Sequence, residues 1–202
     1  MLQDIASLLR KNKLDSLVLF NSLEKPDSSF VYFTGVSKVT GCLVLAQKRK
    51  ALFVSPLEYG NAKKNSSVRD IRVMDEKFYG RLQKMAGKRI GLNMEYASVN
   101  GLERLKKKIK GTMVDASPLL RELRMVKRRG EIEKIEKACK ITDKVYLDVF
   151  RRARSFRTEL EMKNFIEERI LPILGHNTAD KETGALGDLQ VTLIDNYNVV
   201  TS

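Results

Sequence analysis

The chain has 202 residues, enough for one large domain or two small ones, and its 43% hydrophobic and 31% charged residues are typical of a folded globular protein. This composition excludes wholesale disorder, a collagen-like fibre and a disulfide scaffold, and no apolar run approaches the roughly 20 residues of a membrane-spanning helix. The formal net charge is +13, from 38 Lys and Arg against 25 Asp and Glu. A charge of this size attracts nucleic acid non-specifically, but it does not show that nucleic acid is a partner.

The N-terminal stretch is short and amphipathic, and it lacks the apolar core and cleavage site of a signal peptide. The two cysteines, Cys42 and Cys139, lie within apolar patterns and have neither metal-site spacing nor the even framework of a disulfide-rich protein. We therefore expect a cytoplasmic protein with no membrane association.

Apolar residues alternate between helical and strand-like spacing through the first 115 residues. After an N-terminal helix, the pattern predicts strands at 16–20, 30–33, 42–46 and 51–54, a helix at 56–62, a strand at 71–73, a helix at 78–85, a strand at 89–92, a helix at 99–109 and an edge strand at 113–114. The strands at 42–46 and 51–54 are joined by four polar residues and are expected to form a hairpin. Strands that alternate with helices predict an α/β fold, with a mixed sheet flanked by helices.

The remainder of the chain is predicted to be mainly helical. Ser117 and Pro118 have the form of an N-cap followed by a proline at the first helical position, and the short helix that they open is expected to run through Val126, with Gly130 as the break after it. A long helix at 131–150 is expected to bury one face, made of Ile132, Ile135, Ala138, Cys139, Thr142, Tyr146 and Val149. A capping box at Thr158–Glu161 predicts a helix to about residue 171, which Pro172 would end.

The last 30 residues contain a histidine in a glycine-containing loop and two strand-like runs, 191–194 and 197–200. His176 is the one histidine of the chain, so a histidine-rich metal site and a conventional nucleophile triad are not indicated. Asp195 lies inside a strand-like apolar run, where a carboxylate must be paired or ligate a cation. It is either a metal ligand or a turn aspartate between two strands, and the residues alone leave both interpretations open.

Five segments follow one another in a suggestive order: Phe30–Gly35, Leu57–Ala62, Gly87–Gly91, Asp115–Asp143 and Thr158–Glu161. At this spacing they resemble the creatinase, prolidase and aminopeptidase P family of metallopeptidases. The longest, DASPLLRELRMVKRRGEIEKIEKACKITD at Asp115–Asp143, is similar to the segment that joins the two domains of that family. The resemblance covers about residues 1–170.

The resemblance implies a creatinase-type N-terminal domain at 1–115, followed at 116–202 by an interdomain helix and the opening of an α+β pita-bread catalytic domain. It implies hydrolysis at Xaa-Pro bonds of small proline-containing peptides, a pair of divalent metal ions (manganese, cobalt or zinc) and a homo-oligomer. Two site residues carry over. His176 is similar to the histidine that helps to bind substrate and stabilise the transition state, and Asp195 to the first metal-ligand aspartate.

The family's remaining ligands, a second aspartate, a histidine and two glutamates, have no counterpart in the 202 residues. We therefore expect a truncated, split or degenerate member of the family that binds no metal and is inactive as this chain. Two other functions stay open. One is a non-catalytic module that binds a peptide or protein or supports oligomerisation, and the other is a basic nucleic-acid-binding protein, although the aromatic residues do not interleave with the basic runs.

Overall fold

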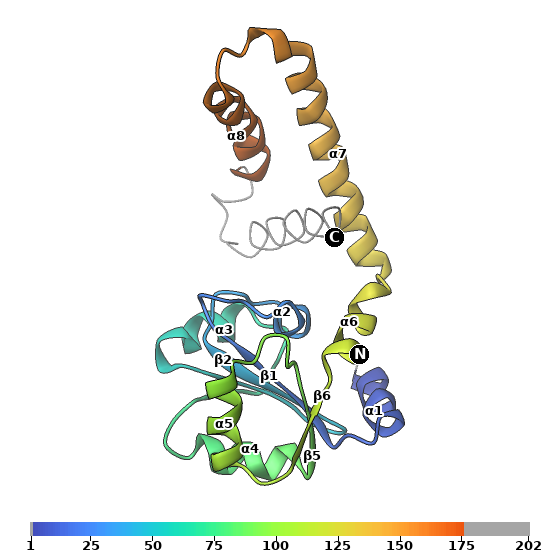
Figure 1. Cartoon of the computed structure of the whole chain (residues 1–202), viewed down its shortest axis with the longest axis vertical. Coiled ribbons are helices and arrows are strands. Elements are labelled where there is room, and N and C mark those ends of the chain that lie inside the picture. The colour runs from blue at the N-terminus through green and yellow to red at the C-terminus, as the bar shows by residue number, and fades with distance from the viewer. Residues whose placement is uncertain (1, 176–202) are drawn as a thin grey trace. The chain divides into compact units, whose positions relative to one another are not determined.

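The computed structural model describes residues 2–175, with side chains described for 5–170. The chain divides into two compact units, Met1–Val126 and Lys127–Ser202 (Figure 1). Within the described residues, no helix is long and apolar enough to cross a membrane.

The first unit is built around a six-stranded mixed sheet. Its elements are α1 (Leu2–Lys11), β1 (Ser16–Asn21), α2 (Ser28–Thr34), β2 (Gly41–Ala46), β3 (Lys50–Val54), the 3-10 turn η1 (Pro56–Glu58), α3 (Tyr59–Asn65), β4 (Ile71–Val73), α4 (Phe78–Ala86), β5 (Arg89–Leu92), α5 (Val99–Lys108), β6 (Thr112–Asp115) and α6 (Ser117–Met125). The strand order is β4-β3-β2-β1-β5-β6. Antiparallel pairing joins β1 to β2 and β2 to β3, and the other three pairs are parallel. The predicted mixed sheet, its hairpin and its edge strand at 113–114 are confirmed.

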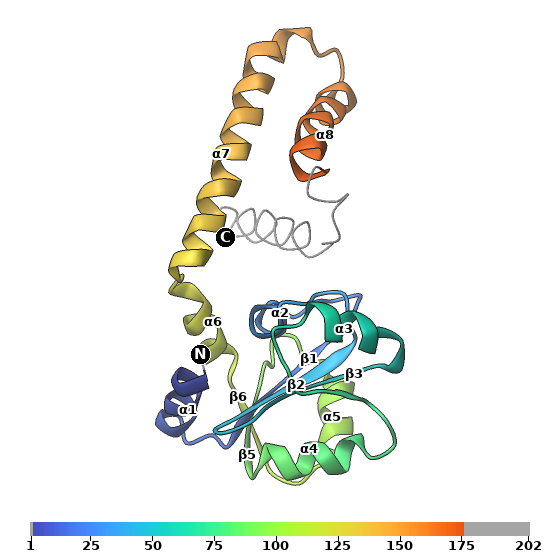
Figure 2. The same ribbon diagram turned by 180° about the vertical axis from the view of Figure 1, so that it is seen from behind.

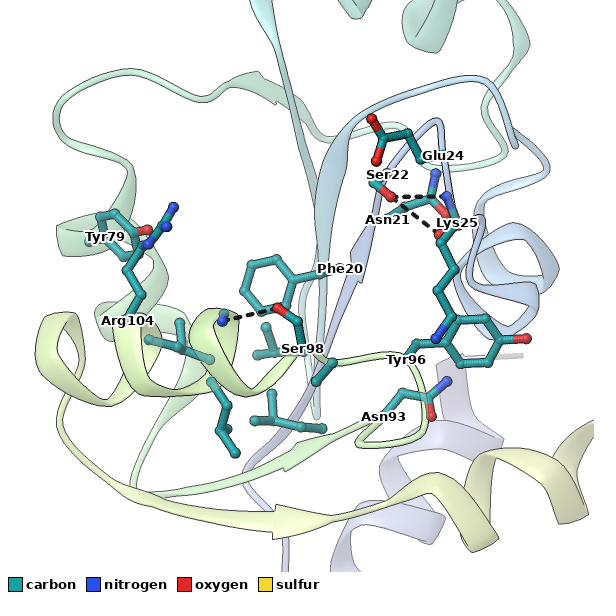
Figure 3. Close-up of a pocket in the computed structure, with 16 residues that line it drawn as sticks. Phe20, Asn21, Ser22, Glu24, Lys25, Tyr79, Asn93, Tyr96, Ser98 and Arg104 are labelled. Carbon is teal, nitrogen blue, oxygen red and sulfur yellow. Dashed lines mark hydrogen bonds between the residues drawn. The ribbon is translucent and has the colours of Figure 1, made fainter.

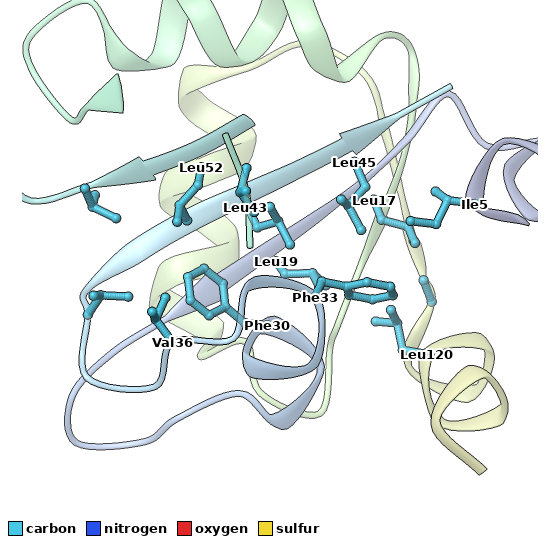
Figure 4. Packing of buried hydrophobic residues seen from close by; sticks show 14 of the residues in the cluster. Ile5, Leu17, Leu19, Phe30, Phe33, Val36, Leu43, Leu45, Leu52 and Leu120 are labelled. Atoms are coloured by element: carbon cyan, nitrogen blue, oxygen red, sulfur yellow. The ribbon is translucent and has the colours of Figure 1, made fainter. Parts of the chain in front are cut away.

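Helices cover both faces of the sheet (Figures 1 and 2). Successive strand residues point to opposite faces, so Leu17 and Leu19 of β1 pack with α1, α2, α3 and α6, whereas Val18 packs with α4 and α5. Figure 4 shows the larger cluster, in which Phe30 and Phe33 of α2 lie against the leucines of the sheet. Burial on both faces explains why these strands are continuously apolar instead of alternating.

The prediction of a strand at 30–33 is wrong, because this segment is the middle of α2. Asp27 caps the start of the helix by accepting backbone N–H groups, and Gly35 ends it with φ of +74° while its N–H donates to the Val31 carbonyl. Phe30 and Phe33 then lie on the buried face at helical spacing. The aromatic and β-branched residues favoured a strand, but the two caps and the packing of the phenylalanines outweigh that propensity.

The second unit contains α7 (Arg129–Arg152), the 3-10 turn η2 (Ala153–Ser155) and α8 (Glu159–Gly175). Gly130 was predicted to break the helix. It lies instead within the first turn of α7. The capping contact from the Arg128 N–H to the Glu131 carboxylate, 2.7 Å, places the break before Arg129. One half of the predicted capping box is confirmed, since the Glu161 N–H donates to Thr158 Oγ1 at 3.1 Å, whereas the Glu161 carboxylate accepts the N–H of Arg157 at 2.7 Å and not that of Thr158. The helix that it opens runs to Gly175, so Pro172 does not end it.

The buried face of α7 differs from the predicted one. Ala138 and Val145 are its buried residues, whereas Ile132, Cys139 and Tyr146 are exposed, with Tyr146 at 67%. The sequence carries two overlapping apolar stripes, and periodicity alone does not choose between them.

Candidate functional site

The two site residues predicted from the sequence, His176 and Asp195, lie outside the described residues, as do the strand-like runs at 191–194 and 197–200. Their roles stay predictions. Among the side chains that the structure describes, no group of three or more His, Cys, Asp or Glu could hold a metal ion. The described residues therefore do not fit the divalent-metal centre that the resemblance implies, and its ligands would have to come from elsewhere.

A buried polar cluster lies where β1 and β5 end. Asp27 is 1% exposed, and its Oδ1 accepts the backbone N–H of Ser29 at 2.7 Å and of Phe30 at 3.4 Å. Asn93, directly after β5, donates its Nδ2 to both carboxylate oxygens at 3.0 Å. The side-chain oxygen of Asn21, the last residue of β1, accepts the backbone N–H of Asp27 at 2.8 Å. The cluster therefore ties α2 to the ends of two parallel strands.

Burial raises the pKa of Asp27 above its ordinary value. The hydrogen bonds from the Ser29 N–H, the Asn93 amide and the Phe30 N–H act in the opposite direction, as does the charge of Arg124. Both carboxylate oxygens are held by fixed donors, so we assign Asp27 a structural role and not that of a proton carrier.

A second polar cluster fixes the start of α6. The Ser117 hydroxyl and backbone N–H donate to Asp115 Oδ1 at 2.6 and 2.9 Å, and these two bonds lower the pKa of Asp115. The Glu95 N–H donates to Ser117 Oγ at 3.2 Å, and the Glu95 carboxylate pairs with Arg121. The N-cap position is Ala116, one residue before the predicted Ser117, because the Asp115 carboxylate takes over the capping of the first turn.

An open cleft of about 480 Å³ lies beside the carboxyl ends of β1 and β5, next to the start of α5. In open α/β sheets, ligands bind at this edge, where parallel strands end and chain connections diverge. Figure 3 shows the cleft. The apolar residues that line it are Val18, Phe20, Leu92, Ala97, Leu102 and Leu105, and the other lining residues are Asn21, Ser22, Glu24, Lys25, Tyr79, Asn93, Tyr96, Ser98, Gly101 and Arg104.

The aromatic and charged side chains of the cleft have a definite arrangement. In Figure 3, Phe20 stands between Tyr79 and Arg104 on one side and Lys25 and Tyr96 on the other. The Lys25 ammonium lies 5.2 Å from the centre of the Tyr96 ring, a cation–π contact. Phe20 is 40% exposed, although the four preceding residues of β1 are buried. The cleft therefore offers an apolar middle with cationic groups on both sides.

Sequence reasoning did not identify this cleft. Its residues come from three separate stretches, 18–25, 79 and 92–105, which meet because β1 pairs in parallel with β5. One local signal was available, a phenylalanine at the end of an otherwise buried strand and directly before a polar turn. The sequence also separated aromatic from basic residues, whereas the fold brings Phe20, Tyr79 and Tyr96 beside Lys25 and Arg104.

The positive charge of the chain is concentrated in the first unit. Residues 1–126 contain 24 Lys and Arg against 12 Asp and Glu, a formal charge of +12, whereas residues 127–202 contain 14 against 13 and carry +1. Any anionic partner is therefore attracted mainly to the first unit.

Comparison with known proteins identifies the family of this fold. The profile of the creatinase/prolidase N-terminal domain matches residues 1–126. The chain is 29% identical over 167 residues to a protein named Xaa-Pro dipeptidase from Pyrococcus horikoshii, a match that covers 81% of this chain and 45% of that protein. It spans about half the length of the curated relatives that it matches.

Two solved structures have the same fold over most of the described residues. The prolidase from Pyrococcus horikoshii OT3 superposes with a TM-score of 0.68 at 24% identity. The match covers 83% of this chain and 47% of the prolidase chain. The X-Pro aminopeptidase from Thermotoga maritima superposes with a TM-score of 0.68 at 22% identity. The match covers 84% of this chain and 48% of the aminopeptidase chain.

Proposed function

This chain belongs to the creatinase/prolidase family, and on that basis we propose that it supplies the N-terminal domain of an Xaa-Pro peptidase acting on small proline-containing peptides. The observation that carries the proposal is the family match over residues 1–126, the same stretch that forms the first compact unit. The relatives named Xaa-Pro dipeptidase support the substrate class, and the likeness to an X-Pro aminopeptidase keeps the aminopeptidase type as an alternative.

We further propose that residues 116–202 include the opening of a catalytic domain, in which His176 binds substrate and Asp195 is a metal ligand. A pair of divalent ions (manganese, cobalt or zinc) would activate a water molecule and polarise the scissile carbonyl. The one histidine of the chain is assigned to substrate binding, so none is left among residues 1–202 to ligate metal. The described residues add no cluster of ligands. These 202 residues by themselves are therefore proposed to be inactive and to bind no metal stoichiometrically.

Two measurements on the full 202-residue chain test this proposal. The first follows proline release from an Xaa-Pro dipeptide with manganese or cobalt at high protein concentration, with the Xaa-Pro dipeptidase of Pyrococcus horikoshii as the active control. The second is an equilibrium titration with the metal. We expect no turnover and no saturable uptake. Proline release above that of a heat-denatured sample, or uptake of one or two metal ions per chain, would overturn the proposal of an inactive chain.

A supporting domain of this kind would act in an assembly. We propose a homo-oligomer in the cytoplasm, and the free Cys42 and Cys139 support a reducing compartment. The alternative of a non-catalytic module that binds a peptide or protein predicts the same inactivity. Light scattering of the purified chain separates the oligomer, which has a multiple of the 23.0 kDa chain mass, from a monomeric binding module.

A basic nucleic-acid-binding function is the second candidate, because the charge of +12 in residues 1–126 favours it. Such binding releases counterions, so the affinity for a mixed-sequence duplex should fall by orders of magnitude between about 50 and 200 mM salt. No measurable binding at the lower salt concentration would remove this candidate.

A further inference from the structure

We propose that the cleft beside β1, β5 and α5 binds a small ligand in which a planar ring is joined to a phosphate group. The cleft is formed entirely by residues of the first unit, so this proposal goes beyond the peptidase function and does not depend on it. Its volume of about 480 Å³ lies within the 300–1,000 Å³ that is usual for sites of small organic ligands.

The apolar middle of the cleft suits a flat ring. Phe20 points to the same face of the sheet as Val18 but, at 40% exposure, lies beyond the cover that α4 and α5 give to the rest of that face. Leu92, Leu102 and Leu105 continue the apolar wall. An aromatic side chain that remains open to solvent inside a concave apolar surface offers a stacking partner to a ring, and covering it would remove apolar area from water.

Three lining residues, Lys25, Ser98 and Arg104, have donors left over, whereas the acceptors left over are the Glu24 carboxylate and the buried side-chain oxygen of Asn93. In the described part of the chain, Arg104 has no hydrogen-bond or ion-pair partner, and the Lys25 ammonium has only the Glu95 carbonyl at 3.5 Å besides its contact with Tyr96. Ser98 accepts the Gly101 N–H at 3.1 Å on Oγ, which leaves its hydroxyl hydrogen free to donate.

The charges of the lining residues also favour an anionic ligand. Glu24 is the one acidic side chain among the residues that line the cleft, against the cations Lys25 and Arg104. The ten-residue helix α5 begins at this edge and adds the positive end of its dipole. The dianion of a phosphate monoester has only acceptor oxygens and two negative charges, so it matches two cations and a free hydroxyl better than a neutral polar group does.

Titration calorimetry of the full chain with phenyl phosphate tests the proposal, with phenol and inorganic phosphate as the two separate halves of the ligand. We expect one site per chain and an affinity for phenyl phosphate at least about tenfold higher than for either half, because ring and phosphate bind together. Arg104→Gln is expected to weaken binding about fivefold or more, and Phe20→Ala to weaken it while leaving the affinity for inorganic phosphate unchanged.

Lys107→Gln is the matched control, because Lys107 is an exposed residue of the same helix outside the cleft and the change in charge is the same. It should alter the affinity by less than about twofold. Equal weakening by Lys107→Gln and Arg104→Gln would show that the basic surface attracts anions generally, and would overturn the proposal. Equal affinity for inorganic phosphate and phenyl phosphate, or no binding of phenyl phosphate, would overturn it as well. Arg104 is exposed, so its substitution leaves the core intact if Phe20→Ala fails to fold.

Discussion

Substitution of Asp27 tests the role of the buried polar cluster. Asp27→Ala removes the oxygens that accept the Ser29 N–H at 2.7 Å and the Asn93 amide at 3.0 Å. Loss of an N-cap side chain costs about 1 kcal/mol, and a buried amide left without its acceptor costs about 1–3 kcal/mol, so the free energy of unfolding should fall by about 2 to 4 kcal/mol. The slowest-exchanging amides of β2 report this free energy in native-state hydrogen exchange.

Asp27→Asn separates hydrogen bonding from charge. The new side chain keeps an oxygen for the cap, and its amide can donate to the side-chain oxygen of Asn93, which has no hydrogen-bond partner among the described residues, once the Asn93 amide turns over. We expect a loss smaller than that of Asp27→Ala, about 1 kcal/mol or less. An equal loss in both variants at pH 7 would show that the charge of Asp27, and not its hydrogen bonding, stabilises the fold.

The pH dependence of Asp27 has a defined sign. Burial raises the pKa of this carboxyl in the folded state, so the folded chain binds more protons than the unfolded chain in the interval above about 3.9, the ordinary value of an aspartate. Wild type should therefore gain stability relative to Asp27→Asn as the pH falls from above the folded pKa towards that value. A difference that changes in favour of wild type as the pH rises would refute the assignment.

Three further predictions concern the backbone, acid stability and thiol reactivity. Gly87 has φ of +77°, and an added Cβ would lie 2.5 Å from Asp15 Cβ, so Gly87→Ala should lower the free energy of thermal unfolding by about 1–3 kcal/mol. Gly60→Ala in α3, where the added Cβ meets nothing within 4 Å, should not lower it, and equal losses would contradict the clash. Hydrogen bonds from the backbone N–H groups of Arg89, the larger contribution, and Lys88 lower the pKa of Asp15 in the folded chain. The stability that the Asp15 carboxylate gives to the fold is therefore present above about pH 3.9 and is lost as the pH falls through this lowered pKa. Urea midpoints of wild type and Asp15→Asn should converge in acid, and a constant gap would disprove this. A thiol reagent should modify the exposed Cys139 quickly and the other, buried thiol only on unfolding; two fast thiols would contradict the burial.

The sequence predicted most of the sheet, because a strand buried on both faces leaves a run of apolar residues bounded by polar turns. It failed at 30–33, where FVYF has the composition of a strand and the decisive contacts are the caps at Asp27 and Gly35. It also failed at Gly130, since a glycine in the first helical turn costs little where the N–H groups need no intrahelical partner. Local composition therefore identified most of the buried strands, but it did not distinguish helix from strand at 30–33 or identify the buried face of α7.

The candidate sites were predictable to different degrees. His176 and Asp195 carry a resemblance, and they stay predictions because they lie outside the described residues. The cleft carries no motif, because its cations and aromatic rings are separated by up to about 80 residues and meet through the parallel pairing of β1 with β5 and the packing of α4 and α5 on one face of the sheet. A site built by topology in this way becomes visible only when the order of the strands is known.

The end of the first unit shows how the same limitation affects a domain boundary. The sequence placed the boundary at 115, after the last strand, and that division stays a prediction, whereas the compact unit continues through α6 to Val126. Leu120 is 1% exposed within the cluster that contains Phe33, and Asp115 and Glu95 hold the first turn of α6 through Ser117. Burying Leu120 contributes about 1.5–3 kcal/mol, and Leu119 and Leu123 of the same helix also pack against this cluster. The family profile also ends at 126, so α6 belongs with the sheet in both packing and sequence.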